Sequence, residues 1–190
     1  MLIDKDLNHG SGQFVHSSRE LRKEYANTIN TECPEICTMC GGRCCKKFPC
    51  HMSPDDFEDL SLITLAKELN KGYISIAKAR KDVFSKYRLF LRMRVEGHPI
   101  VDLDVDEKKL GPCVLLTPTG CILSYKKRPM GAKFLVPFEE KNGMIHCLQY
   151  YGQEELLEDW KPYQNILRVL CVLYTFQRNP KILKKGKVRK

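Results

Sequence analysis

The sequence predicts an α+β fold: a small antiparallel sheet with short helices, a long C-terminal helix and an irregular Cys-rich metal-binding loop region. Three patterns predict this class. Apolar and polar residues alternate in the middle of the chain, apolar residues recur at helical spacing near the C-terminus, and six cysteines crowd between residues 33 and 51. With 190 residues, 43% apolar and 29% charged, the chain can form one globular core.

The composition changes twice along the chain and predicts three parts. Residues 1–30 are polar and predict a loosely ordered N-terminal lead-in. Residues 31–177 hold all ten cysteines and the periodic segments, so they predict a single cysteine-cluster metal-binding domain. Residues 178–190 predict a basic flexible tail.

Two short helices are predicted after the cysteine cluster. Ser53 precedes Pro54 and two aspartates, an arrangement that favours a helix start, and this helix should end near residue 60. Ser61 is a second N-cap, for a helix that runs to about residue 69 and stops at Asn70 and Gly72.

Alternating residues predict strands at 87–95 and 101–106, each half-buried. Gly97-His98-Pro99 lies between them and favours an antiparallel pair, with the Arg-rich face of one strand near the Asp-bearing face of the other. Further on, Asn142-Gly143 is typical of a tight hairpin turn. This hairpin should carry Cys147 back alongside the segment near Phe138.

Residues 154–177 predict one long helix. Its apolar residues recur at a spacing that places them in a single stripe, with Cys171 beside it. The stripe, which we expect to pack on the core, consists of Trp160, Tyr163, Leu167, Leu170, Leu173 and Phe176.

The sequence contains no apolar run of the about 18 to 20 residues that cross a bilayer, so we expect no membrane partner. The first residues carry charges where a secretory leader has its apolar run, which favours a cytoplasmic location. In a reducing compartment, clustered thiols more often bind metal or do redox chemistry than form disulfides.

The formal net charge of +9 is concentrated at the C-terminus. Residues 178–190 contain seven Lys or Arg and no acid, which leaves only +2 for the rest of the chain. Such a run is typical of a solvated extension, and its charge also allows a contact with nucleic acid or an acidic partner.

The cysteine cluster is the most informative stretch. Cys37 and Cys40 form a C-x2-C step that can direct two thiolates at one metal ion, and Cys44 and Cys45 offer two more. Gly41-Gly42 allows the backbone to turn sharply between the two pairs. The neighbouring cations, Arg43, Lys46 and Lys47, would offset the negative charge of a thiolate site.

These residues resemble a known family. The segment Cys37-x2-Cys40-x3-Cys44-Cys45, with Cys113-x7-Cys121, Tyr125-x2-Arg128-Pro129 and Leu135-Val-Pro137, resembles the YkgJ-like cysteine-cluster proteins, which are zinc- or iron-chelating domains with a CxxCxxxCC signature. The resemblance covers residues 37–147. It implies metal chelation, with ligands that include Cys37, Cys40, Cys44, Cys45, Cys113 and Cys121.

One position departs from the family pattern. The family places a cysteine three residues after the proline of Arg-Pro, where this chain has Ala132. Either that thiol is dispensable, or the site is degraded, or another residue replaces it. Cys147 is one replacement, and we include it among the candidate ligands; the others are Cys33, Cys50 and His51.

The sequence therefore predicts a metal-binding protein in which the ion bridges the CxxCxxxCC segment and the Cys113/Cys121 segment. Zinc is the favoured metal, with iron or an iron–sulfur cluster as the alternative, although the ferredoxin-type spacing is absent. Two other functions stay open: a redox protein or metal-dependent enzyme accessory, for which the sequence shows no recognisable catalytic motif, and a zinc-scaffolded nucleic-acid-binding protein that uses the basic tail.

Overall fold

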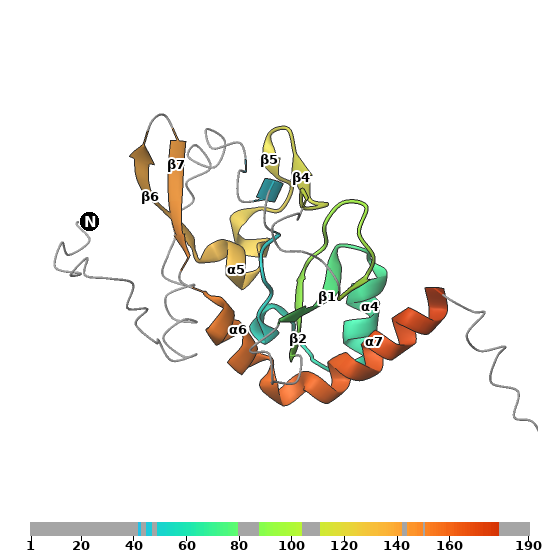
Figure 1. Cartoon of the computed structure of the whole chain (residues 1–190). Helices are drawn as coiled ribbons and strands as arrows, with labels where there is room; N and C mark the ends of the chain where they lie inside the picture. The colour runs from blue at the N-terminus through green and yellow to red at the C-terminus, as the bar shows by residue number, and fades with distance from the viewer. Residues whose placement is uncertain are drawn as a thin grey trace, which may run out of the picture.

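The structure is a computed structural model of the whole chain (Figure 1). It describes residues 42, 45–46, 49–79, 88–103, 111–141, 144–149 and 151–178, with the backbone alone for 136–149 and 177–178. The predicted lead-in at 1–30 and all of the basic tail after Arg178 lie outside the described residues.

The central element is a three-stranded sheet with the order β2-β1-β3. The strands are β1 (Ile74–Ala79), β2 (Arg88–Met93) and β3 (Val101–Asp102). β1 pairs antiparallel with β2 and parallel with β3. The sequence predicted the second and third of these strands but paired them with each other, which is wrong, because β1 lies between them.

β1 escaped prediction because both of its faces are buried. Ser75 and Ile76 are fully buried, and five of its six residues are classed as buried, so the strand shows no clear alternation of apolar and polar residues. Its place beside β3 is fixed by a 2.7 Å hydrogen bond from the Ile76 N–H to the Ile100 carbonyl.

β2 is also more buried than its alternating sequence predicts, since five of its six residues are buried. Arg92 lies on the polar face of the strand, which was expected to be exposed, and yet it is buried. Its Nη2 lies 2.6 Å from Oδ2 of Asp102, and the two side chains are only 5% and 4% exposed. The expected approach of an arginine on one strand to an aspartate on the other is therefore found, although the two strands are not neighbours.

The outer edge of β2 is covered by the short segment Cys50-His51-Met52. The Met52 N–H donates to the Leu91 carbonyl and the Met93 N–H donates to the Cys50 carbonyl, both at 3.0 Å, and His51 forms an antiparallel bridge with Arg92. These bonds complete the backbone pairing of β2 on the side away from β1.

The capping residues after this segment act as predicted. Ser53 and Asp56 form a capping box around the 3₁₀ helix η1 (Pro54–Asp56), which is shorter than expected. Ser61 caps α4 (Leu62–Asn70), and its hydroxyl accepts a bond from the Thr64 N–H. Leu65 and Leu69, one helical turn apart, are the buried residues of α4.

The predicted long C-terminal helix is interrupted. The chain forms α6 (Gln153–Asp159), a 3₁₀ turn η4 (Lys161–Tyr163) and α7 (Gln164–Arg178). Pro162 explains the break, because proline lacks an N–H and its ring clashes with the carbonyl four residues earlier. The apolar periodicity continues across the break, so the sequence pattern alone suggested one helix.

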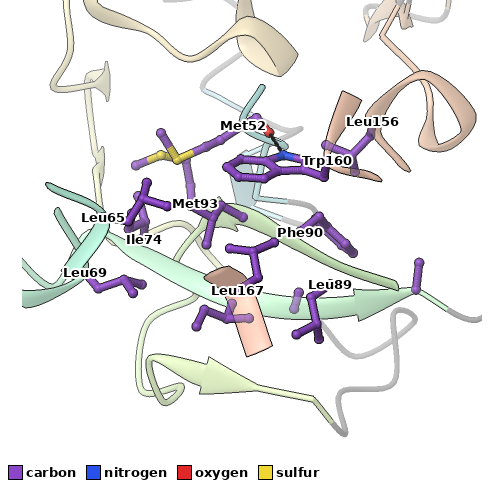
Figure 2. Close-up of a cluster of buried hydrophobic side chains, with 14 of the residues drawn as sticks. Met52, Leu65, Leu69, Ile74, Leu89, Phe90, Met93, Leu156, Trp160 and Leu167 are labelled. Atoms are coloured by element: carbon purple, nitrogen blue, oxygen red, sulfur yellow. Dashed lines mark hydrogen bonds between the residues drawn. The ribbon is translucent and has the colours of Figure 1, made fainter. Parts of the chain in front are cut away.

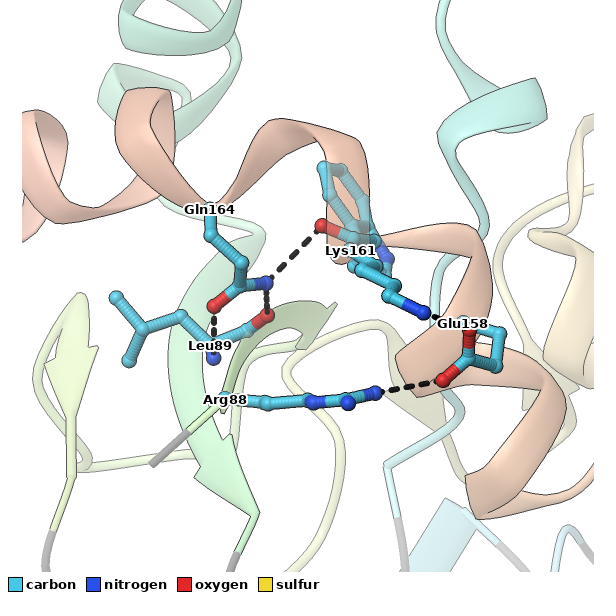
Figure 3. A network of polar contacts seen from close by, with 6 residues as sticks. Arg88, Leu89, Glu158, Lys161 and Gln164 are labelled. Atoms are coloured by element: carbon cyan, nitrogen blue, oxygen red, sulfur yellow. Dashed lines mark hydrogen bonds and ion pairs between the residues drawn. The ribbon is translucent and has the colours of Figure 1, made fainter. Parts of the chain in front are cut away.

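Polar contacts attach this break to the sheet (Figure 3). The Gln164 side chain accepts from the Leu89 N–H at 2.9 Å and donates to the Leu89 carbonyl at 2.8 Å. Arg88 and Lys161 both pair with Glu158, at 2.8 and 2.9 Å. α6 and α7 are thus joined to β2 on either side of η4.

The core lies between the sheet, α4 and the α6–α7 segment, as Figure 2 shows for Leu65, Leu167 and Trp160. Trp160 is fully buried, and its Nε1 donates to the Met52 carbonyl at 2.7 Å. The predicted stripe is correct only at Trp160, Leu167, Leu170 and the partly buried Tyr163. Leu173 and Phe176 are exposed instead.

Tyr174 takes the buried position near the end of α7. Its hydroxyl lies 2.8 Å from the Ala66 carbonyl and 2.7 Å from Oδ1 of Asn70, so it joins α7 to α4. Cys171 is partly buried against the core, as expected for a residue beside the stripe.

Two small hairpins complete the fold. β4 (Leu116–Thr117) pairs with β5 (Gly120–Cys121), and β6 (Leu135–Lys141) pairs with β7 (Met144–Gln149). The second confirms the hairpin predicted from Asn142-Gly143, and it pairs Cys147 with Pro137. In the described part of the chain, every helix is too short or too polar to cross a membrane.

Candidate metal centre

The end of the cysteine cluster forms a tight turn at Gly42. Its φ of 68° lies in the left-handed region that favours glycine, which confirms the sharp turn predicted from Gly41-Gly42. The Lys46 N–H donates to the Gly42 carbonyl at 3.0 Å, and Cys45 and Lys46 are helical.

This turn lies directly against the second cysteine segment. The Cys113 N–H donates to the Cys45 carbonyl at 2.8 Å, although 68 positions separate the two residues in the sequence. Gly42 also packs on Leu116, because a Cβ added to Gly42 would lie 2.6 Å from the Leu116 Cδ1. Figure 1 shows the short turn around residue 45 beside β4 and β5. Two contacts therefore join the two segments.

Cys113 is held in place by the end of the central sheet. It forms an antiparallel bridge with Val95, flanked by bonds from Glu96 N–H to the Pro112 carbonyl at 2.8 Å and from Val114 N–H to the Arg94 carbonyl at 3.0 Å. Its side chain is 6% exposed and belongs to the hydrophobic core.

Cys121 lies on the β4–β5 hairpin, where it pairs with Leu116, the residue that Gly42 contacts. Gly120, with a φ of 112°, allows the hairpin to turn, and the Thr117 hydroxyl donates to the Gly120 carbonyl at 2.7 Å. The register thus places Cys121 in the same structural unit as Cys45 and Cys113, with partial exposure to solvent.

The Tyr125 and Arg128 pair braces the loop that follows Cys121. The Arg128 guanidinium lies 5.9 Å from the Tyr125 ring centroid, and its Nε donates to the Leu123 carbonyl at 3.2 Å. The Tyr125 hydroxyl donates to the Lys133 carbonyl at 3.2 Å. These contacts connect the Cys121 hairpin to α5 (Met130–Lys133).

Ala132 stands where the resembling family has a cysteine. It lies near Cys50 and His51, two of the candidates for replacing that cysteine. Gly131, the preceding residue, donates its N–H to the His51 carbonyl at 3.1 Å. A Cβ on Gly131 would overlap that carbonyl oxygen, so the two backbones are in direct contact. Ala132 therefore follows directly after the residue that contacts the Cys50-His51 segment.

His51 is held as a neutral imidazole. Burial, with the charge of Arg92 as the lesser cause, lowers the pKa of His51 to about 4. Its ring meets Phe90 edge-on at 5.3 Å between centroids. Within the described structure, its buried Nδ1 has no hydrogen-bond partner. A neutral imidazole is the form that ligates metals, so His51 stays a candidate.

Asp56 fixes the start of α5. Its Oδ1 accepts from the Met130 N–H at 2.8 Å, and its Oδ2 accepts from the Ser53 N–H at 2.8 Å. Burial nevertheless raises the pKa of Asp56 to about 6, because the cost of burying the charge exceeds the gain from these hydrogen bonds and from the nearby Lys133.

This pKa predicts a pH dependence of stability. A carboxyl whose pKa is higher in the folded state binds its proton more tightly there, so its contribution stabilises at low pH and is lost as the pH rises through about 6. From pH 4 to pH 8 we expect Asp56 to cost about 2 kcal/mol of unfolding free energy. Urea unfolding of the wild type and of Asp56→Asn at several pH values measures this, because the variant should lack that part of the slope; parallel curves would contradict it.

The other predicted ligands lie outside the side chains that the structure describes. Cys37, Cys40, Cys44 and the alternative Cys33 lie outside the described residues, and of Cys147 only the backbone is described. Among the residues that the structure does describe, no three His, Cys, Asp or Glu side chains form a group that could hold a metal ion. The described part of the candidate centre is thus a junction between two segments.

A second polar cluster lies in the central sheet, and the sequence predicted the approach of its arginine and aspartate but not their burial or the part of His98. The buried Asp102 accepts from Arg92 and also lies 3.0 Å from Nδ1 of His98. Arg92 and Asp102 were expected on the polar faces of their strands, and only the approximate Arg-to-Asp alignment hinted at a pair. Buried charges of this kind usually occur paired.

Comparisons with known proteins add no assignment. No family model, no curated protein and no solved structure matches this chain.

Proposed function

We propose that the protein is a metal-binding module in which one ion bridges the cysteine cluster and the Cys113/Cys121 segment. The observation that carries this proposal is the 2.8 Å hydrogen bond between the Cys113 N–H and the Cys45 carbonyl. It joins the two stretches from which the sequence draws its candidate ligands.

The packing of Gly42 on Leu116 supports the same proposal independently. Leu116 pairs with Cys121 across the β4–β5 hairpin, so the cluster contacts Cys113 and the strand partner of Cys121. A bridging ion requires this proximity, since zinc–sulfur bonds are about 2.3 Å long. The ion would draw its ligands from Cys37, Cys40, Cys44, Cys45, Cys113, Cys121 and Cys147.

The donor chemistry favours zinc, which prefers four thiolate or imidazole ligands in a closed structural site. Iron, alone or in an iron–sulfur cluster, is the alternative that the same thiolates allow. The residues of this chain contribute the thiolates and, through Lys46 beside Cys45, a positive charge that offsets them. Because unfolded chains hold no preformed site, the free energy of metal binding would add to the stability of the fold.

Metal removal is the direct test. We expect protein purified without added metal to contain about one equivalent of zinc, and a strong chelator to lower its melting temperature and its far-UV circular dichroism. Returning zinc should restore both. If complete metal loss leaves the melting temperature and the circular dichroism unchanged, the bridging role is wrong.

Visible absorption spectra distinguish a zinc site from an iron–sulfur cluster. Cobalt substituted into a sulfur-rich tetrahedral zinc site gives strong visible absorption, whereas a brown protein that absorbs near ~400 nm would indicate an iron–sulfur cluster. An octahedral cobalt spectrum would contradict a thiolate site for either metal.

The contact between Gly42 and Leu116 predicts a specific variant. Gly42→Ala should lower zinc affinity by about tenfold, because its Cβ would push Leu116 away and strain the left-handed turn. Competition with a chromophoric chelator measures the affinity.

Gly97→Ala is the matched control. Gly97 has a similar φ of 76°, but in the described structure a Cβ there would have no neighbour within 4 Å. The Gly97→Ala variant should therefore destabilise the fold through backbone strain and leave the zinc affinity nearly unchanged. Adding Leu116→Ala to Gly42→Ala should recover part of the affinity. Equal losses in Gly42→Ala and Gly97→Ala would show that the contact plays no part in binding.

A further inference from the structure

The outer face of α7 carries an apolar stripe that the core does not cover. Val169, Val172, Leu173 and Phe176 are 46%, 51%, 45% and 37% exposed. Their spacing along the chain, of three, one and three residues, places them on one face of an α-helix. We refer to these four residues as the outer stripe.

The exposure of the outer stripe does not come from loose packing of α7. Leu167 and Leu170 on the other face are fully buried, and Tyr174 bonds to α4. In Figure 1, α7 runs along the edge of the molecule with α4 and β2 on one side of it. The helix therefore has two apolar faces, of which the fold uses one.

Along the sequence, the charge of α7 and of the residues after it has a single sign. Residues 164–190 contain eight Lys or Arg, including the exposed Arg168 in α7, and no Asp or Glu. The acid nearest to this segment is Asp159 at the end of α6. An apolar stripe within a purely basic segment is typical of helices that bind at anionic interfaces.

We propose that α7 docks through its outer stripe on an anionic lipid membrane surface, to which the positive charge of α7 and of the sequence after it attracts the protein. From the sequence we expected no membrane partner, because the length of its apolar runs was compared only with that of helices that span the bilayer. A helix that lies in the interface needs far less apolar surface than one that crosses the membrane.

Two other occupants fit the stripe less well. Nucleic acid would attract the basic residues but presents its charged backbone, which gives exposed Val, Leu and Phe side chains no apolar medium. A second copy of the chain would bring two segments of eight positive charges close together, and like charges repel. A lipid interface accepts a convex apolar stripe without a preformed groove and supplies the negative charge.

Vesicle co-sedimentation of the full chain tests the proposal. We expect the protein to pellet with vesicles that contain about 30% phosphatidylserine, at least about tenfold more strongly than with pure phosphatidylcholine vesicles, and to be released partly by salt. A protein that stays in the supernatant with both vesicle types would overturn the proposal.

Variants at exposed positions separate the apolar and the charged contributions. Leu173→Gln with Phe176→Gln should weaken binding about tenfold, and truncation after Gln177 should do the same. Asn165→Gln with Thr175→Gln, two exposed polar residues of the same helix, is the matched control and should bind as the wild type. Circular dichroism checks that each variant folds.

Three further results would each contradict the proposal. Wild-type binding by the Leu173→Gln/Phe176→Gln variant would exclude the outer stripe, and wild-type binding by the truncated chain would exclude the basic residues; either result overturns the proposal. If analytical ultracentrifugation instead finds a dimer that the double variant abolishes, while vesicles bind nothing, the stripe is an interface between two copies.

Discussion

Replacing Asp102 with alanine is expected to lower the free energy of unfolding by about 3–5 kcal/mol. Asp102 and Arg92 are almost fully buried and lie 2.6 Å apart, so the variant leaves the Arg92 charge in the interior without its counterion. Asp102 also lies 3.0 Å from His98 Nδ1, and that contact is lost with it. Urea unfolding, followed by tryptophan fluorescence, measures the change.

Two controls make this result specific. Glu158→Ala removes the partner of Arg88 and Lys161 at the surface, where the Glu158 side chain is 53% and that of Arg88 24% exposed, and should cost about 1 kcal/mol or less. Arg92→Met combined with Asp102→Leu removes both buried charges and should recover most of the stability, because well-packed apolar residues can replace a buried pair. A loss in Asp102→Ala no larger than in Glu158→Ala would show that burial does not strengthen this pair's role.

Replacing Trp160 with alanine is expected to cost about 3–5 kcal/mol as well. Trp160 is fully buried at the break between α6 and α7, and its ring meets Phe57 and Tyr163 edge-on at 6.1 and 6.0 Å. The variant leaves a large cavity and removes the donor to the Met52 carbonyl. Denaturant unfolding followed by circular dichroism measures the loss.

Trp160→Phe separates the cavity from the hydrogen bond. It keeps most of the apolar volume and leaves the Met52 carbonyl without its donor, so we expect a loss of about 1–2 kcal/mol. Val172→Ala, on the exposed face of α7, should change stability by less than about 0.5 kcal/mol. If Trp160→Ala is as mild as Val172→Ala, the break between the helices does not depend on the indole.

The sequence predicts the local features of this fold well, because their signals are carried by neighbouring residues. Ser53 and Ser61 cap helices as expected, and the Asn142-Gly143 hairpin pairs Cys147 with Pro137. The Gly42 turn of the candidate centre belongs to the same group, since its left-handed backbone is a local signal, whereas its packing on Leu116 is not.

The errors concern features that depend on distant residues. The order of the central sheet depends on β1, which is buried on both faces and so lacks the alternation of β2. The sequence placed the arginines of one strand near the aspartates of the other, but nothing in either segment shows that Arg92 and Asp102 are buried as a pair. The break at Pro162 is the exception: its signal is local, and the apolar periodicity outweighed it.

In the candidate metal centre, too, the local features were predicted and those that depend on distant residues were not. The sequence identified the two cysteine segments, and the structure adds how one described cysteine of the cluster, Cys45, meets Cys113. The role of Gly131, whose backbone touches that of His51, could not be predicted, because a glycine between Met130 and Ala132 has no pattern that marks close packing.

The Cys50-His51-Met52 segment has a consequence for solubility. It covers the outer edge of β2, and Gly131 in turn contacts its other side through the His51 carbonyl. A sheet edge covered in this way cannot template the addition of a strand from another molecule. Because Cys50 is the last of the six clustered cysteines, the segment that covers this edge belongs to the cluster itself, and a variant that loosens it is expected to expose the edge to pairing with another chain.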